Sequence, residues 1–241
     1  MKKTILIFTT LFFVLIYIDA SSQVIKGNGK ILTDNRDLTG FNELIAQGSF
    51  NLVLTQGEKE GVQIVTDENV VELFQTRVDG KKLYITMVAD VKKSASTNVY
   101  VSVKELVNII LLSEITLKTE SVIHFDELKI FSGGLSQLNL EVYAASLNMQ
   151  LTDGTYTYLK GYTEKFTAEV HDETELNAFE MQIDYCDILA SGLTEIMIDV
   201  QKDLKMLISG GSNLYYTGNP VISQRIFSST GFIVKRQKAA N

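Results

Sequence analysis

The sequence has few of the residues on which disulfide, metal and redox chemistry depend. Its 241 residues include one cysteine, one proline, two histidines and no tryptophan. With Cys186 alone, no disulfide can form within the chain, so packing and hydrogen bonds must hold the fold. His124 and His171 do not stand at the spacing of a zinc site. We therefore predict no metal ion and no cofactor.

Basic residues are also in the minority. The chain has 22 Lys and Arg against 29 Asp and Glu, a formal net charge of -7. A surface of this charge repels phosphate backbones, so we exclude nucleic acid as a partner.

The motifs of common enzymes are missing. Gly210 and Gly211 are not followed by the lysine of a phosphate-binding loop, and neither Gly-x-Ser-x-Gly nor the calcium-binding repeat Gly-Gly-x-Gly-x-Asp occurs. The arginines lie away from carboxylate clusters within the repeats, which argues against a polysaccharide lyase; they are Arg36, Arg77, Arg225 and Arg236. We predict no catalytic residue and expect a protein that is not an enzyme.

The first 22 residues have the pattern of a secretory signal peptide. Lys2 and Lys3 precede an apolar stretch that ends at Ile18, and Ala20 and Ser22 suit a cleavage site. The apolar stretch is shorter than the ~20 residues of a spanning helix, which disfavours the alternative of an uncleaved anchor. We predict a mature chain without a membrane span, located in the periplasm, at the outer membrane or outside the cell.

From about residue 106 the chain repeats itself. Polar residues that close an apolar run recur at steps of 19, 20, 19, 20, 18 and 19 residues; they are Ser113, Ser132, Thr152, His171, Ser191, Ser209 and Ser228. Short segments with alternating apolar residues follow each of them, as strands with one buried face require. Such a period indicates a repeat architecture.

The composition of these units favours a β-solenoid. They lack the asparagine or cysteine ladder of leucine-rich repeats, and they are too rich in β-branched residues and glycine for paired helices. We predict an all-β protein in which residues 106–241 form rungs of about 20 residues. In this interpretation the recurrent turn hydroxyls bond to backbone groups, and glycines such as Gly134 and Gly210 allow a positive φ at the corners.

Residues 23–105 read as a separate β-rich unit that covers the first rung and so protects its open strand edge. Strands are expected at 41–46, 50–55, 62–66 and 83–87. One short helix is expected within 67–77, with Asp67 as its cap.

Two features are candidates for binding, and neither identifies a site. Asp172, Glu173 and Glu175 stand at one corner, as a weak calcium site or as a solvated acidic turn. The tyrosines of the repeats could form an exposed ladder for sugar rings, or fill and flank the column; they are Tyr143, Tyr156, Tyr158, Tyr162, Tyr185, Tyr215 and Tyr216. The binding residues therefore stay unknown.

The last expected strand is followed by Lys235, Arg236 and Lys238. Clustered positive charge commonly protects an open strand edge, and pairing of two chains through that edge is the alternative. We expect a monomer or an edge-paired oligomer.

Three stretches in this order resemble a known family. They are "GNGKILTDNRDLTGFNELIAQGSFNLVLTQG" at 27–57, "VQIVTDENVVELFQTRVDGKKLYI" at 62–85, and the Ser-Gly turns that end in "LISGGSNLYYTGNP". They are similar to the family called putative auto-transporter adhesin, head GIN domain. Corners 113–115 and 171–175 depart from the Ser-Gly pattern.

The resemblance implies a right-handed single-stranded parallel β-helix that bacteria of the Bacteroidetes type export. It implies no catalytic residues. We therefore expect an exported, non-enzymatic adhesion or interaction module of the bacterial envelope that binds a protein or glycan surface. The alternative is a carbohydrate-binding or polysaccharide-degrading β-helix protein.

Overall fold

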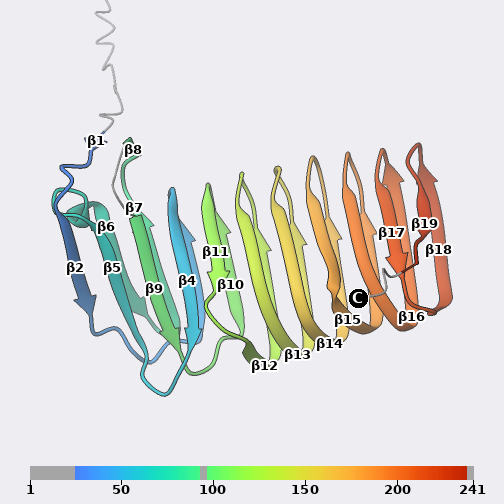
Figure 1. The fold of residues 1–241 in the computed structure, drawn as a ribbon, viewed down its shortest axis with the longest axis horizontal. Helices are drawn as coiled ribbons and strands as arrows, with labels where there is room; N and C mark the ends of the chain where they lie inside the picture. Colours follow the sequence, from blue (N-terminus) through green and yellow to red (C-terminus); the bar gives the residue numbers. More distant parts are fainter. Residues whose placement is uncertain (1–24, 93–96, 238–241) are drawn as a thin grey trace, which may run out of the picture.

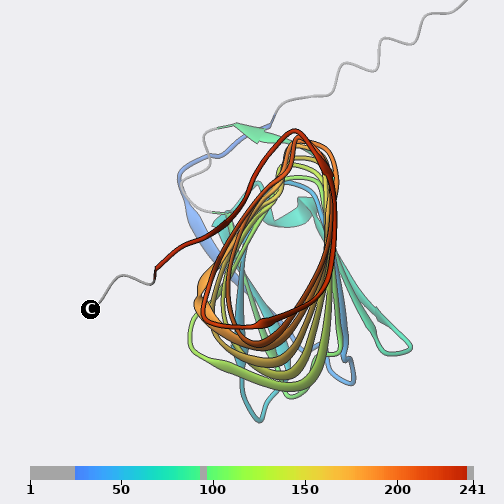
Figure 2. The ribbon, with the colours of Figure 1, turned by 90° about the vertical axis from the view of Figure 1, so that its right-hand side faces the viewer.

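The computed structural model describes residues 25–92 and 97–237, so the expected signal peptide lies outside the described residues. The chain forms a β-solenoid in which successive turns stack along one axis (Figure 1). Viewed along this axis the backbone outlines an elongated ring (Figure 2). Within the described ranges no helix is long and apolar enough to cross a membrane.

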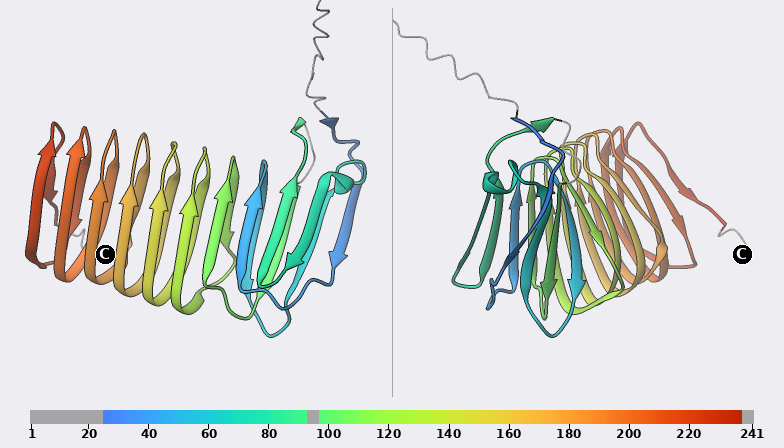
Figure 3. Two further views of the ribbon diagram at one scale, coloured as in Figure 1. Left: turned by 180° about the vertical axis from the view of Figure 1, so that it is seen from behind. Right: turned by 60° about the vertical axis from the view of Figure 1, so that its left-hand side comes forward.

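The repeated part consists of parallel strands, each paired with the equivalent segment one turn later. The long strands β13 to β16 follow one limb of the ring, bend, and return along the other limb (Figure 3). The strands are β10 (Asn108–Leu112), β11 (Ile115–Thr119), β12 (Ile123–Ser132), β13 (Gln137–Leu151), β14 (Tyr156–Val170), β15 (Glu175–Ala190), β16 (Glu195–Gly210), β17 (Asn213–Thr217), β18 (Val221–Ser229) and β19 (Ile233–Lys235).

The strands before residue 105 extend the same stack, in a spatial order that differs from the sequence. β3 and β4 pair in parallel with β10 and β11 on one side, and with β7 and β9 on the other. Strand pairing thus crosses the predicted boundary at 105. The strands are β1 (Ile25–Lys26), β2 (Ile31–Arg36), β3 (Glu43–Gln47), β4 (Phe50–Gln56), β5 (Gly61–Asp67), β6 (Phe74–Asp79), β7 (Lys82–Met87), β8 (Val91–Lys92) and β9 (Thr97–Val103).

The helix expected within 67–77 is wrong. Only a single 3-10 turn forms, η1 (Val71–Leu73), and β6 follows it at once. Asp67 ends β5, and its side chain accepts a hydrogen bond from the backbone N–H of Gly29 instead of capping a helix. Antiparallel pairing with β7 buries Phe74 and overrides the local helical pattern, because tertiary contacts outweigh small differences in propensity.

The core runs through the centre of the ring and follows from the alternation along each strand. Inward residues of successive turns pack on one another; the register partners Leu128, Leu147 and Phe166 are each 0–1 % exposed. Full burial of one such side chain contributes roughly 1.5–3 kcal/mol. Cys186 is 3 % exposed and burial raises its pKa well above the ordinary range, so it packs as an apolar side chain.

The tight turns share one backbone conformation. One position in six successive turns has φ between +57° and +85°; its occupants are Ser113, Gly134, Asp153, Asp172, Gly192 and Gly210. The corners at 113–115 and 171–175, which depart from the Ser-Gly pattern, are therefore regular, since Ser113 and Asp172 adopt the left-handed conformation themselves. A Cβ at Gly210 would lie 2.8 Å from the backbone N and O of Gly192, so close stacking also requires glycine there.

The alignment of the turns differs from the sequence pattern by one residue at Ser113 and at Ser132. Ser113 is the equivalent of Gly134, one position after the other turn residues of the pattern. Ser132 is a register partner of Leu151 and points inward at 0 % exposure, and Gly133 is the equivalent of Thr152. A turn hydroxyl does bond to the previous turn at Ser209, whose Oγ donates to the Ala190 carbonyl at 3.1 Å. A second set of hydroxyls, unforeseen from sequence, lines the inside of the corner at 0–2 % exposure: Ser136, Thr155, Thr174, Thr194 and Ser212.

Candidate functional site: an aromatic groove at the bend

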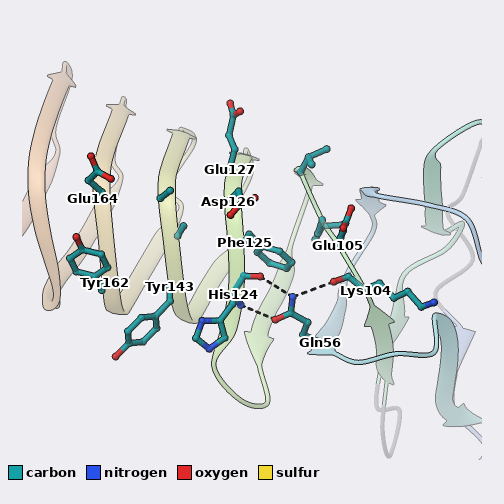
Figure 4. Close-up of a pocket in the computed structure, with 14 residues that line it drawn as sticks. Gln56, Lys104, Glu105, His124, Phe125, Asp126, Glu127, Tyr143, Tyr162 and Glu164 are labelled. Carbon is teal, nitrogen blue, oxygen red and sulfur yellow. Dashed lines mark hydrogen bonds between the residues drawn. The ribbon is translucent and has the colours of Figure 1, made fainter.

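An open groove of about 740 Å³ lies at the bend of the solenoid, where the turn of β3 and β4 meets the long repeats. Its walls come from the end of β4, the loop 104–107 between β9 and β10, the start of β12, and the bends of β13 and β14 (Figure 4). We call it the aromatic groove, since four aromatic residues line it. Phe125 is largely buried, and the other three are His124, Tyr143 and Tyr162.

These three side chains form a short ladder along the solenoid axis. They are register partners in successive turns, so the stacking of the fold brings their rings together. The ring centroids of His124 and Tyr143 lie 5.3 Å apart with planes tilted by 37°, and those of Tyr143 and Tyr162 lie 6.5 Å apart at 43°. Both distances fall in the range of favourable aromatic pairs. Tyr143 is 43 % exposed and offers ring surface to a ligand.

Gln56 fixes the near end of this ladder. Its Nε2 donates to the backbone carbonyls of His124 at 2.8 Å and Lys104 at 3.2 Å, and its Oε1 accepts from the N–H of His124 at 2.8 Å (Figure 4). The amide therefore pairs with β12 as a strand backbone would. Three segments distant in sequence are held in one arrangement, so the groove is largely pre-formed.

The far end of the ladder is fixed by an ion pair. The hydroxyl of Tyr162 donates to Asp184 Oδ2 at 3.0 Å, and Lys202 Nζ lies 2.8 Å from the same oxygen. The hydrogen bond with Lys202 lowers the pKa of Asp184 from its ordinary value, and Asp184 in turn raises the pKa values of Tyr162 and Lys202. The hydroxyl of Tyr162 is thus engaged, and its ring is the part left for a ligand.

Four of the residues that line the groove carry carboxylates. Glu105, Asp126, Glu127 and Glu164 line the groove with Lys104, and Glu127 Oε1 lies 3.2 Å from Lys129 Nζ outside it. Carboxylates accept hydrogen bonds from hydroxyl and ammonium groups and repel anions. Among the residues that the structure describes, no group of three or more His, Cys, Asp or Glu is placed to hold a metal ion.

The predicted tyrosine ladder is not continuous. Tyr143 and Tyr162 lie in the aromatic groove, whereas Tyr156 and Tyr158 lie on one limb beside Lys118. Burial and a hydrogen bond with Glu180 raise the pKa of Tyr158 to about 12.

The remaining tyrosines serve local contacts. Lys202 lies 5.3 Å from the ring centre of Tyr185, and Arg236 covers Tyr215 at 3.8 Å. Tyr216 packs against the core.

Other residues considered from the sequence lie elsewhere. His171 is in a tight turn, where its Nδ1 is 2.7 Å from Ser191 Oγ. In the same turn Asp172 accepts from Thr152 Oγ1 at 2.7 Å. Burial, followed by repulsion from Glu195, raises the pKa of Glu175.

His124 and Gln56 are members of the site that the sequence did not indicate. The signal for His124 was its 19-residue step to Tyr143, which repeats to Tyr162 and matches the period of the turns. Gln56 lies 68 residues before its partner and carries no comparable signal.

Comparison with solved structures shows the same fold in bacterial proteins. A putative adhesin from Bacteroides fragilis matches with a TM-score of 0.81 and 19% identity, over 89% of this chain and 100% of that one. A putative adhesin from Parabacteroides distasonis matches with a TM-score of 0.70 and 16% identity, over 88% and 99% of the two chains.

Another solved structure, also from Parabacteroides distasonis, is described as a putative lipid binding protein. It matches with a TM-score of 0.66 and 18% identity, over 89% of this chain and 100% of that one. At these identities the likeness concerns the fold alone. A search of curated proteins found no match.

The comparison with protein families agrees with the repeats and with the fold. One family model covers residues 40–220, which include the strands from β3 to β17. The chain belongs to the family described as "Putative auto-transporter adhesin, head GIN domain".

Proposed function

We propose that this protein is an exported, non-enzymatic binding module of the bacterial envelope that attaches to glycans through the aromatic groove. The family and two of the solved relatives carry the description of adhesins, which supports a role in attachment. The observation that carries the proposal is the ladder of His124, Tyr143 and Tyr162 in a groove whose ends are held by Gln56 and Asp184.

The chemistry of the groove favours neutral or amino sugars. Aromatic faces pack against the apolar faces of sugar rings, and the carboxylates accept hydrogen bonds from hydroxyl or ammonium groups. The same carboxylates repel uronic acids and sulfated or sialylated chains. A groove that is open along the solenoid axis suits an extended chain.

The test measures binding of the mature chain to an array of neutral, amino and acidic glycans. The variant Tyr143→Ala should bind about tenfold more weakly, a loss of ~1.4 kcal/mol. Tyr156→Ala is the matched control, because Tyr156 is 42 % exposed, against 43 % for Tyr143, and lies outside the groove. Equal losses in both variants, or a preference for acidic glycans, would contradict the assignment of the groove.

The same samples test the non-enzymatic part of the proposal. Bound polysaccharides should keep their length during incubation with the protein. Release of new reducing ends or of unsaturated products would instead establish a polysaccharide-degrading enzyme.

A further inference from the structure

The C-terminal end of the solenoid is open. Among the strands that the structure describes, β18 pairs only with β16, and β19 only with β17. Inward side chains of the last turn are uncovered: Ile222 is 39 % and Phe227 40 % exposed, whereas their register partners Leu204 and Ile208 are 0 % exposed. Ile226 and Phe232 add exposed apolar surface at 50 % and 63 %.

The opposite end has a different cover, although its outermost strands β2 and β6 likewise have one described partner each, β5 and β7. There β2, β5 and β6 run antiparallel to their neighbours and cover the end (Figures 1 and 3). The guanidinium of Arg36 also donates to the backbone carbonyl of Phe74 in β6. A long apolar edge without such protection is a site for pairing with another strand.

The open end also differs from the rest of the molecule in charge. Residues 204–241 contain none of the 29 acidic residues, and the last of these, Asp203, accepts a hydrogen bond from Ser223 Oγ of β18 at 2.7 Å. This part has five basic residues: Lys205, Arg225, Lys235, Arg236 and Lys238. An uncovered apolar edge with a positive surround on an acidic protein is selective for a partner of negative charge.

Two of the three basic residues expected to protect this edge, Lys235 and Arg236, lie beside β17 and the loop that follows it. Lys235 Nζ donates to Asn219 Oδ1 at 2.7 Å, and Arg236 stacks on Tyr215 at 3.8 Å and bonds through its backbone to Tyr216. Both side chains therefore contact β17 or the loop that follows it. Lys238 lies outside the described residues. The positive charges therefore flank the edge of β18 and leave it accessible.

We propose that the edge of β18 binds an extended segment of another polypeptide, in which apolar residues alternate with Asp or Glu. Backbone groups of the edge would bond to the added strand, as in other cases of strand addition. The apolar residues would cover Ile222 and Phe227, and the carboxylates would meet the basic surround. This site is distinct from the aromatic groove and independent of the glycan proposal.

Two other occupants fit the observations less well. Two-fold pairing of β18 with a second copy would bring two positively charged ends together, with Arg225 near the middle of each strand. A lipid surface could neutralise the charge, but hydrocarbon leaves the N–H and C=O groups of the edge without partners.

The experiment measures fluorescence anisotropy of a labelled nine-residue peptide that alternates valine and glutamate. The mature chain should bind it at least about tenfold more tightly than a peptide that alternates valine and lysine, and more weakly as salt rises. N-methylation of alternate residues in the acidic peptide should abolish binding, because it removes backbone donors.

Two matched variants locate the site. Ile226→Asp places a carboxylate on the open edge and should weaken binding of the acidic peptide about tenfold. Leu207→Asp is the control, since Leu207 is the register partner of Ile226, is also exposed at 39 %, and lies on β16, which is already paired on both sides. It should leave the affinity within about twofold, and thermal unfolding of both variants confirms that they are folded.

Each other result overturns the proposal. Equal affinity for the acidic and basic peptides, no binding at millimolar concentration, or equal effects of the two variants would exclude an acidic strand at β18. Self-association of the free protein that Ile226→Asp abolishes would assign the edge to a second copy. The edge would be assigned to lipid if the wild type bound anionic phosphatidylglycerol vesicles but not the peptide, and if Ile226→Asp lost the binding to vesicles.

Discussion

The guanidinium of Arg36 donates a hydrogen bond of 2.8 Å to the backbone carbonyl of Phe74, across the N-terminal end of the solenoid. The same side chain donates to Thr76 Oγ1 and Val71 O, and pairs with Asp34 at 2.8 Å. One side chain thus satisfies acceptors on β6 and η1 that the last antiparallel strands leave open. A side chain closes this end, whereas the other end of the column lacks any comparable cover among the described residues.

Replacement of Arg36 by methionine should lower the free energy of unfolding by about 1–3 kcal/mol, because half-buried acceptors lose a charged donor. Urea unfolding measures the change. Arg77→Met is the control, since the Arg77 side chain is 61% exposed and makes only surface contacts, an ion pair with Asp79 at 3.6 Å and a stack on the ring of Tyr84 at 3.9 Å. Its effect should stay below about 1 kcal/mol. Equal losses would show that Arg36 acts only as a surface residue.

The left-handed position of the tight turns predicts opposite effects at two of its members. Gly210→Ala should destabilise the protein by roughly 1–3 kcal/mol, because φ is +70° and the new Cβ meets the backbone of Gly192. Asp153→Gly should stabilise it by up to about 1 kcal/mol, since φ is +57° at a residue with a Cβ. Chemical unfolding of both variants tests the sign, and a stabilised Gly210→Ala would refute the shared conformation.

Two threonines inside the ring should respond in opposite ways to substitution by valine. Thr157 Oγ1 is buried without a hydrogen-bond partner, so Thr157→Val should raise the free energy of unfolding by about 1 kcal/mol. Thr155 Oγ1 donates to Thr152 O at 2.7 Å, so Thr155→Val should lower it by a similar amount, about 1 kcal/mol. Thermal unfolding at one pH compares the two. A loss of stability at Thr157 would mean that its hydroxyl has a partner in solution.

The ion pair of Asp184 and Lys202, which fixes the far end of the aromatic groove, should stabilise the fold in a pH-dependent way. The pKa of Asp184 is lowered from 3.8 in the folded protein, chiefly by its hydrogen bond with Lys202, so the charged pair stabilises the fold fully above that pH. This stabilisation is lost as the pH falls through the lower folded value. Asp184→Asn should therefore unfold more easily than the wild type at pH 7, and the difference should shrink below pH 3.8. Urea midpoints across this range measure it, and a difference that does not vary with pH would contradict the charged pair.

Part of the geometry of the candidate site could be predicted from residue spacing alone. The tyrosines at 143 and 162 differ by one period of the repeat, so stacking places them side by side whatever the details of packing. The role of Gln56 was not readable, because a side-chain amide that pairs with β12 leaves no pattern in the chain. The helix expected near Asp67 failed for a related reason, since only β7, which follows in the chain, makes a strand of residues 74–79.

The repeat pattern specified the class of fold, because apolar alternation on a period of 18 to 20 residues, interrupted by small residues, can bury its apolar face only if successive turns stack. Only pairing between distant strands sets the one-residue shifts at Ser113 and Ser132, the insertion of β3 between β7 and β10 and of β4 between β9 and β11, and the different cover of the two ends. These features depend on hydrogen bonds between strands that are distant in the chain. Local propensity and periodicity contain no information about which distant edge a strand will meet.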